Sequence, residues 1–263
     1  MNINANNLSV NNQQTSSLTS VNQSMASGQR INSTADDPSG QAIINALSAQ
    51  LNAQDMGVRN ANDGVSMLQT ADGASDMVTQ SLQRMSELSL QAINGTLNTS
   101  QRGVLNNEFQ QSLQTINQIV ESTRFNGQTL LNGDMSSVNI ALGSESNSTL
   151  TLPTLTTDAL SITGLSIADP VNASTALAGV ASAIEQLGTS RAEFGAQQNS
   201  LISSIDNLQN QNIASYATKS QISDTDFAKA IAEQSRQNIL NESAIAMQSQ
   251  GNQSKATVLQ LLN

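Results

Sequence analysis

The sequence contains no cysteine, no histidine and no tryptophan. Without cysteine it cannot form disulfides or use a thiol nucleophile, and without histidine it lacks the commonest general base and metal ligand. We therefore expect no catalytic residues, no bound metal and no cofactor. Aromatic residues make up only 2% of the chain. Because aromatic side chains are the usual large fillers of a core, their scarcity favours thin helical bundles packed by aliphatic residues and methionine.

Charged residues are also scarce, at 11% of the chain against the ~25% of typical domains. Residues 1–29 contain no charged side chain, whereas free solvated tails usually carry charge. We therefore expect this segment to be buried against identical neighbours. The formal net charge is −10, and the ten Lys and Arg residues are scattered. Because nucleic-acid binding needs clustered basic residues, that class of function is excluded.

Long apolar runs are absent from the sequence as well. No stretch approaches the ~18 consecutive apolar residues of a membrane span, so no membrane association is expected. The segment from Met1 to Ser20 has neither a basic start nor an apolar run, so no cleaved signal peptide is expected. An exported protein of this kind would leave the cell without cleavage of a leader.

Heptad patterns predict long helices in the first part of the chain. A first helix is expected from about Leu8 to Arg30, and a second from about Gln41 to Ile93, where Asn94-Gly95 supplies a helix stop. Gln54 is the only polar residue in the seam of the second helix before Ala71. A third helix carries the apolar positions Leu105, Phe109, Leu113, Ile116 and Val120.

The last part of the chain returns to helical periodicity. The apolar residues from Leu177 to Leu208 share one heptad frame. Arg191 and Gln198 occupy positions of this frame but are not apolar. In the final helix a 4-3 seam is formed by Leu240, Ala244, Met247, Gly251, Ser254, Val258 and Leu261. We interpret the methionines at positions 25, 67, 77, 85 and 247 as fillers of core gaps rather than a ligand surface.

The middle of the chain has a different period. Asn126-Gly127 and Asn132-Gly133 are turn signals between short apolar segments. Residues 138–142 and 160–163 alternate apolar and polar side chains, which is typical of half-buried strands. These patterns predict two or three short β-hairpins.

Acidic residues cluster before two of the expected helices, as Asp36-Asp37 and as Asp224 with Asp226. Such groups could form a carboxylate pair or bind Ca²⁺. The ligand pattern of a calcium loop, with its central glycine and terminal glutamate, is missing. Because aspartate is a preferred N-cap residue, we favour helix capping for both groups.

These patterns predict a mainly α fold. We expect an elongated rod of long antiparallel helices, with paired N- and C-terminal coiled-coil helices and a small β-hairpin region in the middle of the chain. The expected division is an innermost terminal domain of residues 1–38 and 223–263, and a helical rod domain of residues 39–125 and 173–222. A short β-hairpin region then spans residues 126–172.

Several separated segments of the sequence resemble bacterial flagellins, over about residues 1–142 and 175–263. They are Ser27-Gly28-Gln29-Arg30-Ile31-Asn32-Ser33, Arg59-Asn60-Ala61-Asn62-Asp63-Gly64, Arg124-Phe125-Asn126-Gly127, Ile222-Ser223-Asp224-Thr225-Asp226-Phe227 and Val258-Leu259-Gln260-Leu261-Leu262. The resemblance implies a structural subunit that self-assembles into the extracellular flagellar filament for swimming motility, with nearly absent outer variable domains. It also implies export through the flagellar type III apparatus.

The resemblance further implies partners and functional residues. The partners are further copies of the chain, the flagellar cap and hook–filament junction proteins, an export chaperone at the C-terminal helix, and an innate immune Toll-like receptor of a host. The residues implied in receptor recognition are Leu82, Gln83, Arg84, Leu88 and Glu108. The residues expected in filament assembly are Leu18, Val21, Met25, Leu240, Met247, Val258, Leu261 and Leu262. Read without the resemblance, Arg84 and Glu108 are better interpreted as solvated charges on a helix face.

Two other functions are compatible with a scaffold of this kind. A hook–filament junction protein resembles flagellin at both ends, but the run from Arg59 to Gly64 and the motif at 258–262 favour flagellin. An enzyme inserted into the scaffold, such as a zinc peptidase, would need histidine ligands in an added domain. The chain has no histidine.

Overall fold

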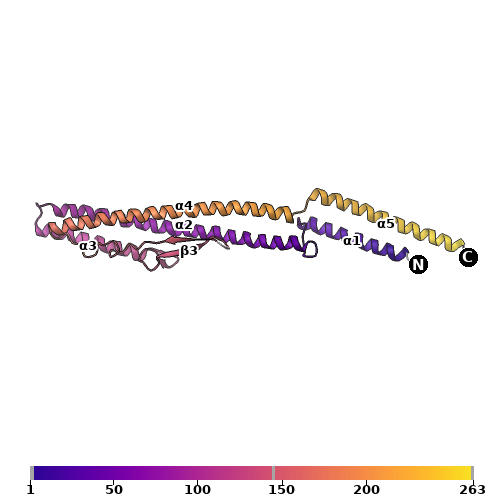
Figure 1. Cartoon of the computed structure of the whole chain (residues 1–263), viewed down its shortest axis with the longest axis horizontal. Coiled ribbons are helices and arrows are strands. Elements are labelled where there is room, and N and C mark those ends of the chain that lie inside the picture. The colour runs from indigo at the N-terminus through magenta and orange to yellow at the C-terminus, as the bar shows by residue number, and fades with distance from the viewer. Residues whose placement is uncertain (1–2, 144–145, 262–263) are drawn as a thin grey trace. The chain divides into compact units, whose positions relative to one another are not determined.

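The structure is a computed structural model that describes residues 3–143 and 146–261, with side chains for residues 15–143, 146–254 and 257. Its helices are α1 (Ile3–Ser27), α2 (Pro38–Ile93), α3 (Thr99–Ser122), α4 (Pro170–Ser223) and α5 (Phe227–Leu261) (Figure 1). Its strands are β1 (Arg124–Phe125), β2 (Gln128–Thr129), β3 (Ser137–Ala141) and β4 (Asn147–Thr151). The mainly α fold with a small β region is therefore confirmed.

The chain forms two compact units. Unit 1 comprises Met1–Leu51 and Ile213–Asn263, and unit 2 comprises Asn52–Asn212. Helices α2 and α4 contribute residues to both units, so the two units are joined by helical chain. The division into three parts expected from the sequence stays a prediction.

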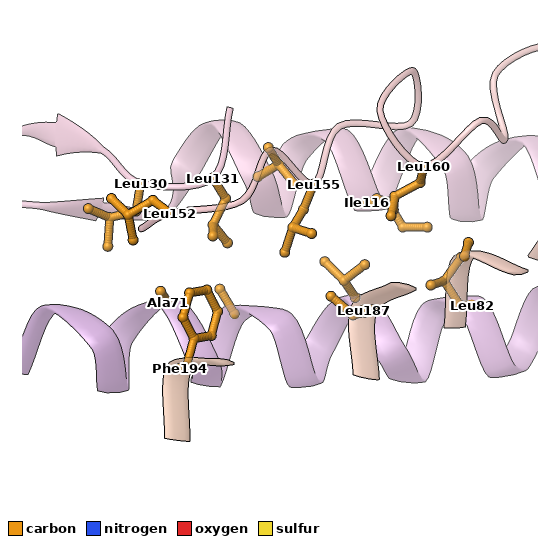
Figure 2. Close-up of a cluster of buried hydrophobic side chains, with 14 of the residues drawn as sticks. Ala71, Leu82, Ile116, Leu130, Leu131, Leu152, Leu155, Leu160, Leu187 and Phe194 are labelled. Carbon is orange, nitrogen blue, oxygen red and sulfur yellow. The ribbon is translucent and has the colours of Figure 1, made fainter. Parts of the chain in front are cut away.

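The core of unit 2 lies between α2, α3, α4 and the segment that follows α3. Phe109 on α3 and Phe194 on α4 are its largest fully buried side chains. Figure 2 shows Phe194 and Leu187 of α4 close to Ala71 and Leu82 of α2. Leucines of the middle segment cover this group from the other side; they are Leu130, Leu131, Leu152, Leu155 and Leu160. The hydrophobic effect of these aliphatic residues therefore joins three helices and the β region in one core.

Arg191 is a charged residue at a heptad position of α4, and it joins that helix to α2. Its Nε donates to Asp72 Oδ1 at 2.8 Å, and its Nη1 donates to Asp76 Oδ1 at 2.8 Å. The hydrogen bond with Asp72, followed by the attraction of both carboxylates, raises the pKa of the Arg191 guanidinium above its ordinary value. Because Asp72 and Asp76 are one helical turn apart, a single fork of donors binds both.

Both hairpins of the structure fall where turn signals or alternation occur in the sequence. β1 pairs with β2 across Asn126-Gly127, whose φ angles of 50° and 82° are those of a type I′ turn. β3 pairs with β4, with Val138 opposite Leu150. Leu150 is buried and Val138 is half-buried, so the apolar face of this hairpin covers the core.

The expected strand at residues 160–163 is wrong. This segment consists of turns, in which Ile162 N donates to Thr157 O at 2.9 Å and Ser161 adopts a φ of 54°. Leu160 and Ile162 are both buried, as the alternation indicates. Consecutive turns with local backbone hydrogen bonds can produce the same alternation as a strand, and no strand pairs with this segment in the described part of the chain.

The end of α1 differs from the prediction, and the turn after α2 is formed differently from the prediction. α1 ends at Ser27 rather than Arg30, because Gly28 adopts a φ of 72°. α2 ends at Ile93 as predicted, but Gly95 is not among the residues with positive φ. The turn is stabilised instead by Asn94, whose side-chain Oδ1 accepts from Thr96 N at 3.1 Å.

The β3–β4 hairpin is held against the helices by backbone contacts. A Cβ on Gly57 of α2 would lie 2.2 Å from the carbonyl oxygen of Leu142, so only glycine permits this approach. Next to it, Asn60 Nδ2 donates to Ala141 O at 3.0 Å. On β4, the side-chain amide of Gln197 accepts from Thr151 N at 2.9 Å and donates to Thr151 O at 3.2 Å. The Gln197 side chain thus occupies the place of a neighbouring strand.

We predict that Gly57→Ala destabilises the protein by about 1–3 kcal/mol, the usual cost of overpacking a site that cannot yield. The added methyl group meets a backbone carbonyl rather than a flexible side chain. Urea unfolding followed by circular dichroism measures the change. The matched control is Gly73→Ala on the same helix, where nothing lies within 4 Å of the new Cβ. There the better helix propensity of alanine should stabilise by up to ~1 kcal/mol. Equal effects of the two variants would contradict the tight docking.

Candidate functional site

The first candidate surface is the terminal pair, which we define as helices α1 and α5 packed against each other in unit 1. On α1 the half-buried face includes Leu18, Val21 and Met25, three of the residues expected in filament assembly. Across the pair, Gln234 Nε2 donates to Asn22 Oδ1 at 2.7 Å. Among the described side chains of the two helices, none belongs to the buried hydrophobic core. The terminal pair therefore buries little apolar surface within one copy of the chain.

On α5 the large apolar side chains are mostly exposed. The predicted assembly residues Leu240 and Met247 are 42% and 74% exposed. The prediction that Met247 fills a gap in the core is therefore wrong. Other exposed apolar residues of α5 are Phe227, Ile231, Ile239 and Ile245. The half-buried positions carry small or polar residues instead; they are Ala230, Glu233, Gln234, Gln237, Asn241 and Ala244. Val258 and Leu261 lie outside the described side chains, and Leu262 lies outside the described residues.

Backbone hydrogen bonds connect the segment after α1 with the segment between α4 and α5. Arg30 N donates to Ser223 O at 2.6 Å, and Thr225 N donates to Gly28 O at 3.0 Å. The Arg30 guanidinium adds a bond from Nη2 to Ile222 O at 2.7 Å. The two flagellin-like motifs at Ser27–Ser33 and Ile222–Phe227 thus form one joint in unit 1.

The acidic residues beside this joint act as caps and loop ties. Asp37 Oδ1 accepts from Gly40 N at 2.8 Å at the start of α2, and Asp226 Oδ1 accepts from Lys229 N at 3.2 Å at the start of α5. Asp36 Oδ2 accepts from the backbone of both Asn32 and Ser33. The capping interpretation is therefore confirmed for Asp37 and Asp226. Within the described residues, no group of acidic side chains has the arrangement of a metal site.

The second candidate surface is the Arg84 cluster, which we define as Gln83, Arg84 and Glu87 of α2 with Glu108 of α3. Arg84 donates from Nε and Nη2 to Glu108 Oε1, at 2.9 Å and 2.7 Å, and from Nη1 to Glu87 Oε2 at 3.0 Å. These bonds, the one with Glu108 first, raise the pKa of Arg84 above its ordinary value. About half of the Arg84 and Glu108 side chains is exposed. The cluster thus presents an ordered arginine at the surface between two helices.

Leu82 and Leu88, which the resemblance places in the same recognition site, are fully buried in the core of unit 2. They hold the α2 turn that carries Gln83 and Arg84, but they do not offer their side chains at the surface. Sequence reasoning missed Met77, which is 55% exposed rather than a core filler. Met77 lines a groove of about 330 Å³ that reaches Arg84 and is completed by Gln80, Ser81, Ser112, Thr115 and Ile119. Met77 directly precedes Val78, which is buried. The helical period could therefore have shown that the Met77 side chain lies off the buried face.

None of the helices among the described residues combines enough length with enough apolar character to cross a bilayer. Comparisons with known proteins place the chain more narrowly.

A sequence profile of the bacterial flagellin N-terminal helical region matches residues 1–136, and one of the C-terminal helical region matches residues 177–262. The chain belongs to the bacterial flagellin family. The flagellin of Halalkalibacterium halodurans is 39% identical to it over 242 residues, which cover 90% of this chain and 89% of that protein. The flagellar filament 30.7 kDa core protein of Treponema maltophilum is 30% identical over 256 residues, which cover 91% and 90% of the two chains.

Solved structures agree with this assignment. The crystal structure of Bacillus cereus flagellin matches with a TM-score of 0.52 at 30% identity, over 57% of this chain and 88% of that chain. A putative flagellar hook-associated protein from Vibrio parahaemolyticus matches with a TM-score of 0.62 at 14% identity, over 72% and 100% of the two chains. At that identity the second match shows the fold alone. The flagellin is thus a structural subunit of the filament of the extracellular flagellum.

We predict that the Asp36 loop of this flagellin loosens in acid. Backbone hydrogen bonds from Ser33, and then from Asn32, lower the pKa of the Asp36 carboxyl below its ordinary value. The stabilisation is complete above the unfolded pKa of ~3.9 and is lost as pH falls through the lowered folded pKa. An NMR titration should therefore show the amide shifts of Asn32 and Ser33 changing with a midpoint below ~3.9.

The control for this titration is Asp36→Asn, which retains an acceptor oxygen but cannot titrate. It should abolish the amide step while leaving the helices intact. A midpoint at or above the ordinary aspartate value in the unaltered chain would contradict the assigned hydrogen bonds.

Proposed function

We propose that this flagellin self-assembles into a filament that serves swimming motility, and that assembly buries the terminal pair against other copies. The observation that carries the proposal is the outward orientation of the large apolar side chains of α5, together with the absence of buried hydrophobic residues among the described side chains of α1 and α5. A helix pair of this kind is marginal alone, because most helical stability in proteins comes from tertiary packing.

The energy for assembly is available on the exposed face of α5. Burying an isoleucine, leucine or methionine side chain contributes roughly 1.5–3 kcal/mol. Ile239 and Ile245 are 63% and 56% exposed, so their burial alone would change an association constant by more than tenfold. The uncharged polar composition of residues 1–29 suits the same environment, because amide and hydroxyl groups are less costly to desolvate than charges.

Membership in the family supports a proposal of further partners. We infer that the chain is exported through the flagellar type III apparatus without a cleaved signal peptide, and that an export chaperone binds the C-terminal helix before assembly. The exposed apolar residues of α5 would then be covered by the chaperone first and by other subunits later. Contacts with the cap and hook–filament junction proteins would use the same terminal helices.

We also infer that the Arg84 cluster is recognised by the flagellin-sensing Toll-like receptor of a host. Arginine is enriched among the residues that dominate protein interfaces. The two acidic partners hold the Arg84 guanidinium in one place, so less side-chain entropy is lost on binding. Buried Leu82 and Leu88 support this surface from beneath, and the groove beside Met77 extends it.

For assembly, we predict that Ile239→Asn with Ile245→Asn raises the critical concentration for polymerisation by more than tenfold. The two changes remove apolar side chains that are exposed in one copy and buried in the filament. Negative-stain electron microscopy after seeding with sheared filaments, together with sedimentation of the polymer, measures the effect.

The matched control is Ile239→Leu with Ile245→Leu, which retains the apolar surface and should polymerise nearly as the unaltered chain does. Circular dichroism should show the same helix content for both monomers. Normal filaments from the asparagine variant would count against burial of this face.

For recognition, we predict that Arg84→Ala lowers receptor activation about tenfold or more, as expected for an arginine at the centre of an interface. A reporter assay with purified monomer measures activation. Because the Arg84 side chain is half exposed, thermal unfolding should change little.

Arg236→Ala is the matched control, since Arg236 also pairs with a glutamate three residues away but lies on α5. It should signal as the unaltered chain does. Equal signalling by the Arg84 and Arg236 variants would overturn the assignment of the Arg84 cluster.

A further inference from the structure

A polar layer interrupts the apolar seam between α2 and α4 in unit 2. Gln54 of α2 and Asn212 of α4 stand at heptad positions in this seam, with side chains only 5% and 9% exposed. Buried glutamine and asparagine are unusual in a seam otherwise built from residues such as Ala61, Ile205 and Leu208. They therefore call for a physical explanation.

The hydrogen bonds of the layer run across the two helices. Gln54 Nε2 donates to Gln211 Oε1 at 3.0 Å, and Asn212 Nδ2 donates to Asp55 Oδ1 at 2.9 Å. The side-chain oxygens of Gln54 and Asn212 are buried and have no hydrogen-bond partner among the described residues. A buried acceptor that makes no hydrogen bond is destabilising, so this layer is less favourable than leucine would be at the same positions.

A second polar contact joins the same helices at a distance from the layer. Arg191 binds Asp72 and Asp76, and it lies roughly 30 Å along α4 from Asn212, at 1.5 Å per residue. Both contacts fit one antiparallel alignment, in which residues rising along α2 meet residues falling along α4. Two separated contacts of this kind determine the axial position of one helix on the other.

The apolar residues of the seam determine that position much less. A slip of α4 by one heptad keeps aliphatic side chains facing aliphatic side chains, because the pattern repeats. The same slip would place the amides of Gln54 and Asn212 against apolar residues and would carry Arg191 away from its two aspartates. In coiled coils a buried polar residue is the best-attested means of selecting one register, at a cost in stability.

We propose that Gln54 and Asn212 fix a single axial register of α4 on α2. Arg191 supports the same register but does not hold it alone, because its side chain is about a third exposed and exposed ion pairs contribute little. The layer gives up stability in the monomer to exclude slipped alignments. Its use rests on the proposed function, since copies of a chain pack into one lattice only if α2 and α4 present the same surfaces in each copy.

The absence of cysteine from the chain permits a direct test. Nitroxide labels at Asn62→Cys and Ser203→Cys, exposed positions on α2 and α4, report the alignment through their distance distribution. The unaltered layer should give one narrow distribution. In Gln54→Leu with Asn212→Leu, we expect a second population or a broad distribution, since a heptad slip moves α4 by about 10 Å. The melting temperature should rise by about 2–4 °C.

The matched control is Gln50→Leu with Asn210→Leu, the same chemical changes at exposed positions of the same helices. It should retain the narrow distribution. A narrow, unchanged distribution in the Gln54 and Asn212 variant would overturn the proposal, and so would a fall in its melting temperature. If that variant does not fold, Gln54→Met alone is measured in the same way. Loss of helix content in both would also overturn the proposal, because the layer would then be needed for folding itself.

These measurements use monomer and need no filament. Failure of the unaltered chain to polymerise would therefore count against the proposed function and leave the register measurement intact. A narrow distribution from the leucine variant would count against the register proposal and leave the proposed function intact.

Discussion

Close packing of aliphatic side chains between helices is the interaction on which unit 2 depends. With aromatic residues at 2% of the chain, the core is filled mainly by leucine, isoleucine, valine, methionine and alanine, and Phe109 and Phe194 are its fully buried aromatic residues in the described part of the chain. Short side chains fill a core only if the helices approach closely, and glycine then becomes valuable where backbone meets backbone, as at Gly57. Charge enters the seam between α2 and α4 only in a paired form at Arg191, whose partly exposed guanidinium binds both Asp72 and Asp76.

Unit 1 shows what happens where this packing is missing. Its described buried hydrophobic residues are Ile31, Ile44 and Leu51, all outside the terminal pair. The joint between Gly28–Arg30 and Ser223–Thr225 is held by backbone hydrogen bonds and by the bond from the Arg30 side chain to Ile222 O. Backbone bonds fix direction but contribute modestly to net stability. Unit 2 thus carries an ordered surface on its own, whereas the described side chains of the terminal pair bury little apolar surface within one copy of the chain.

The sequence predicts those features of the fold that depend on neighbouring residues. The type I′ turn at Asn126-Gly127, the cap at Asp37 and the end of α2 at Ile93 all depend on a few adjacent residues. The errors concern contacts between distant residues. Alternation at 160–163 reports burial and not strand pairing, and the heptad of the last helix does not say which face meets α1 when the residues there are small or polar. The partners of Arg191 and Gln54 lie more than a hundred residues away, so no local pattern contains them. For the recognition residues, helical spacing alone could have separated buried Leu82 from exposed Gln83.

The side chain of Gln197 has a consequence beyond holding β4 in place. A two-stranded hairpin leaves unpaired donors and acceptors along its outer edge, and such an edge can recruit a like strand from another molecule into a growing fibril. The Gln197 side chain bonds both the N–H and the carbonyl of Thr151, so these groups are not available to another strand. The Gln197 side chain thereby blocks edge-to-edge pairing with a like strand at Thr151.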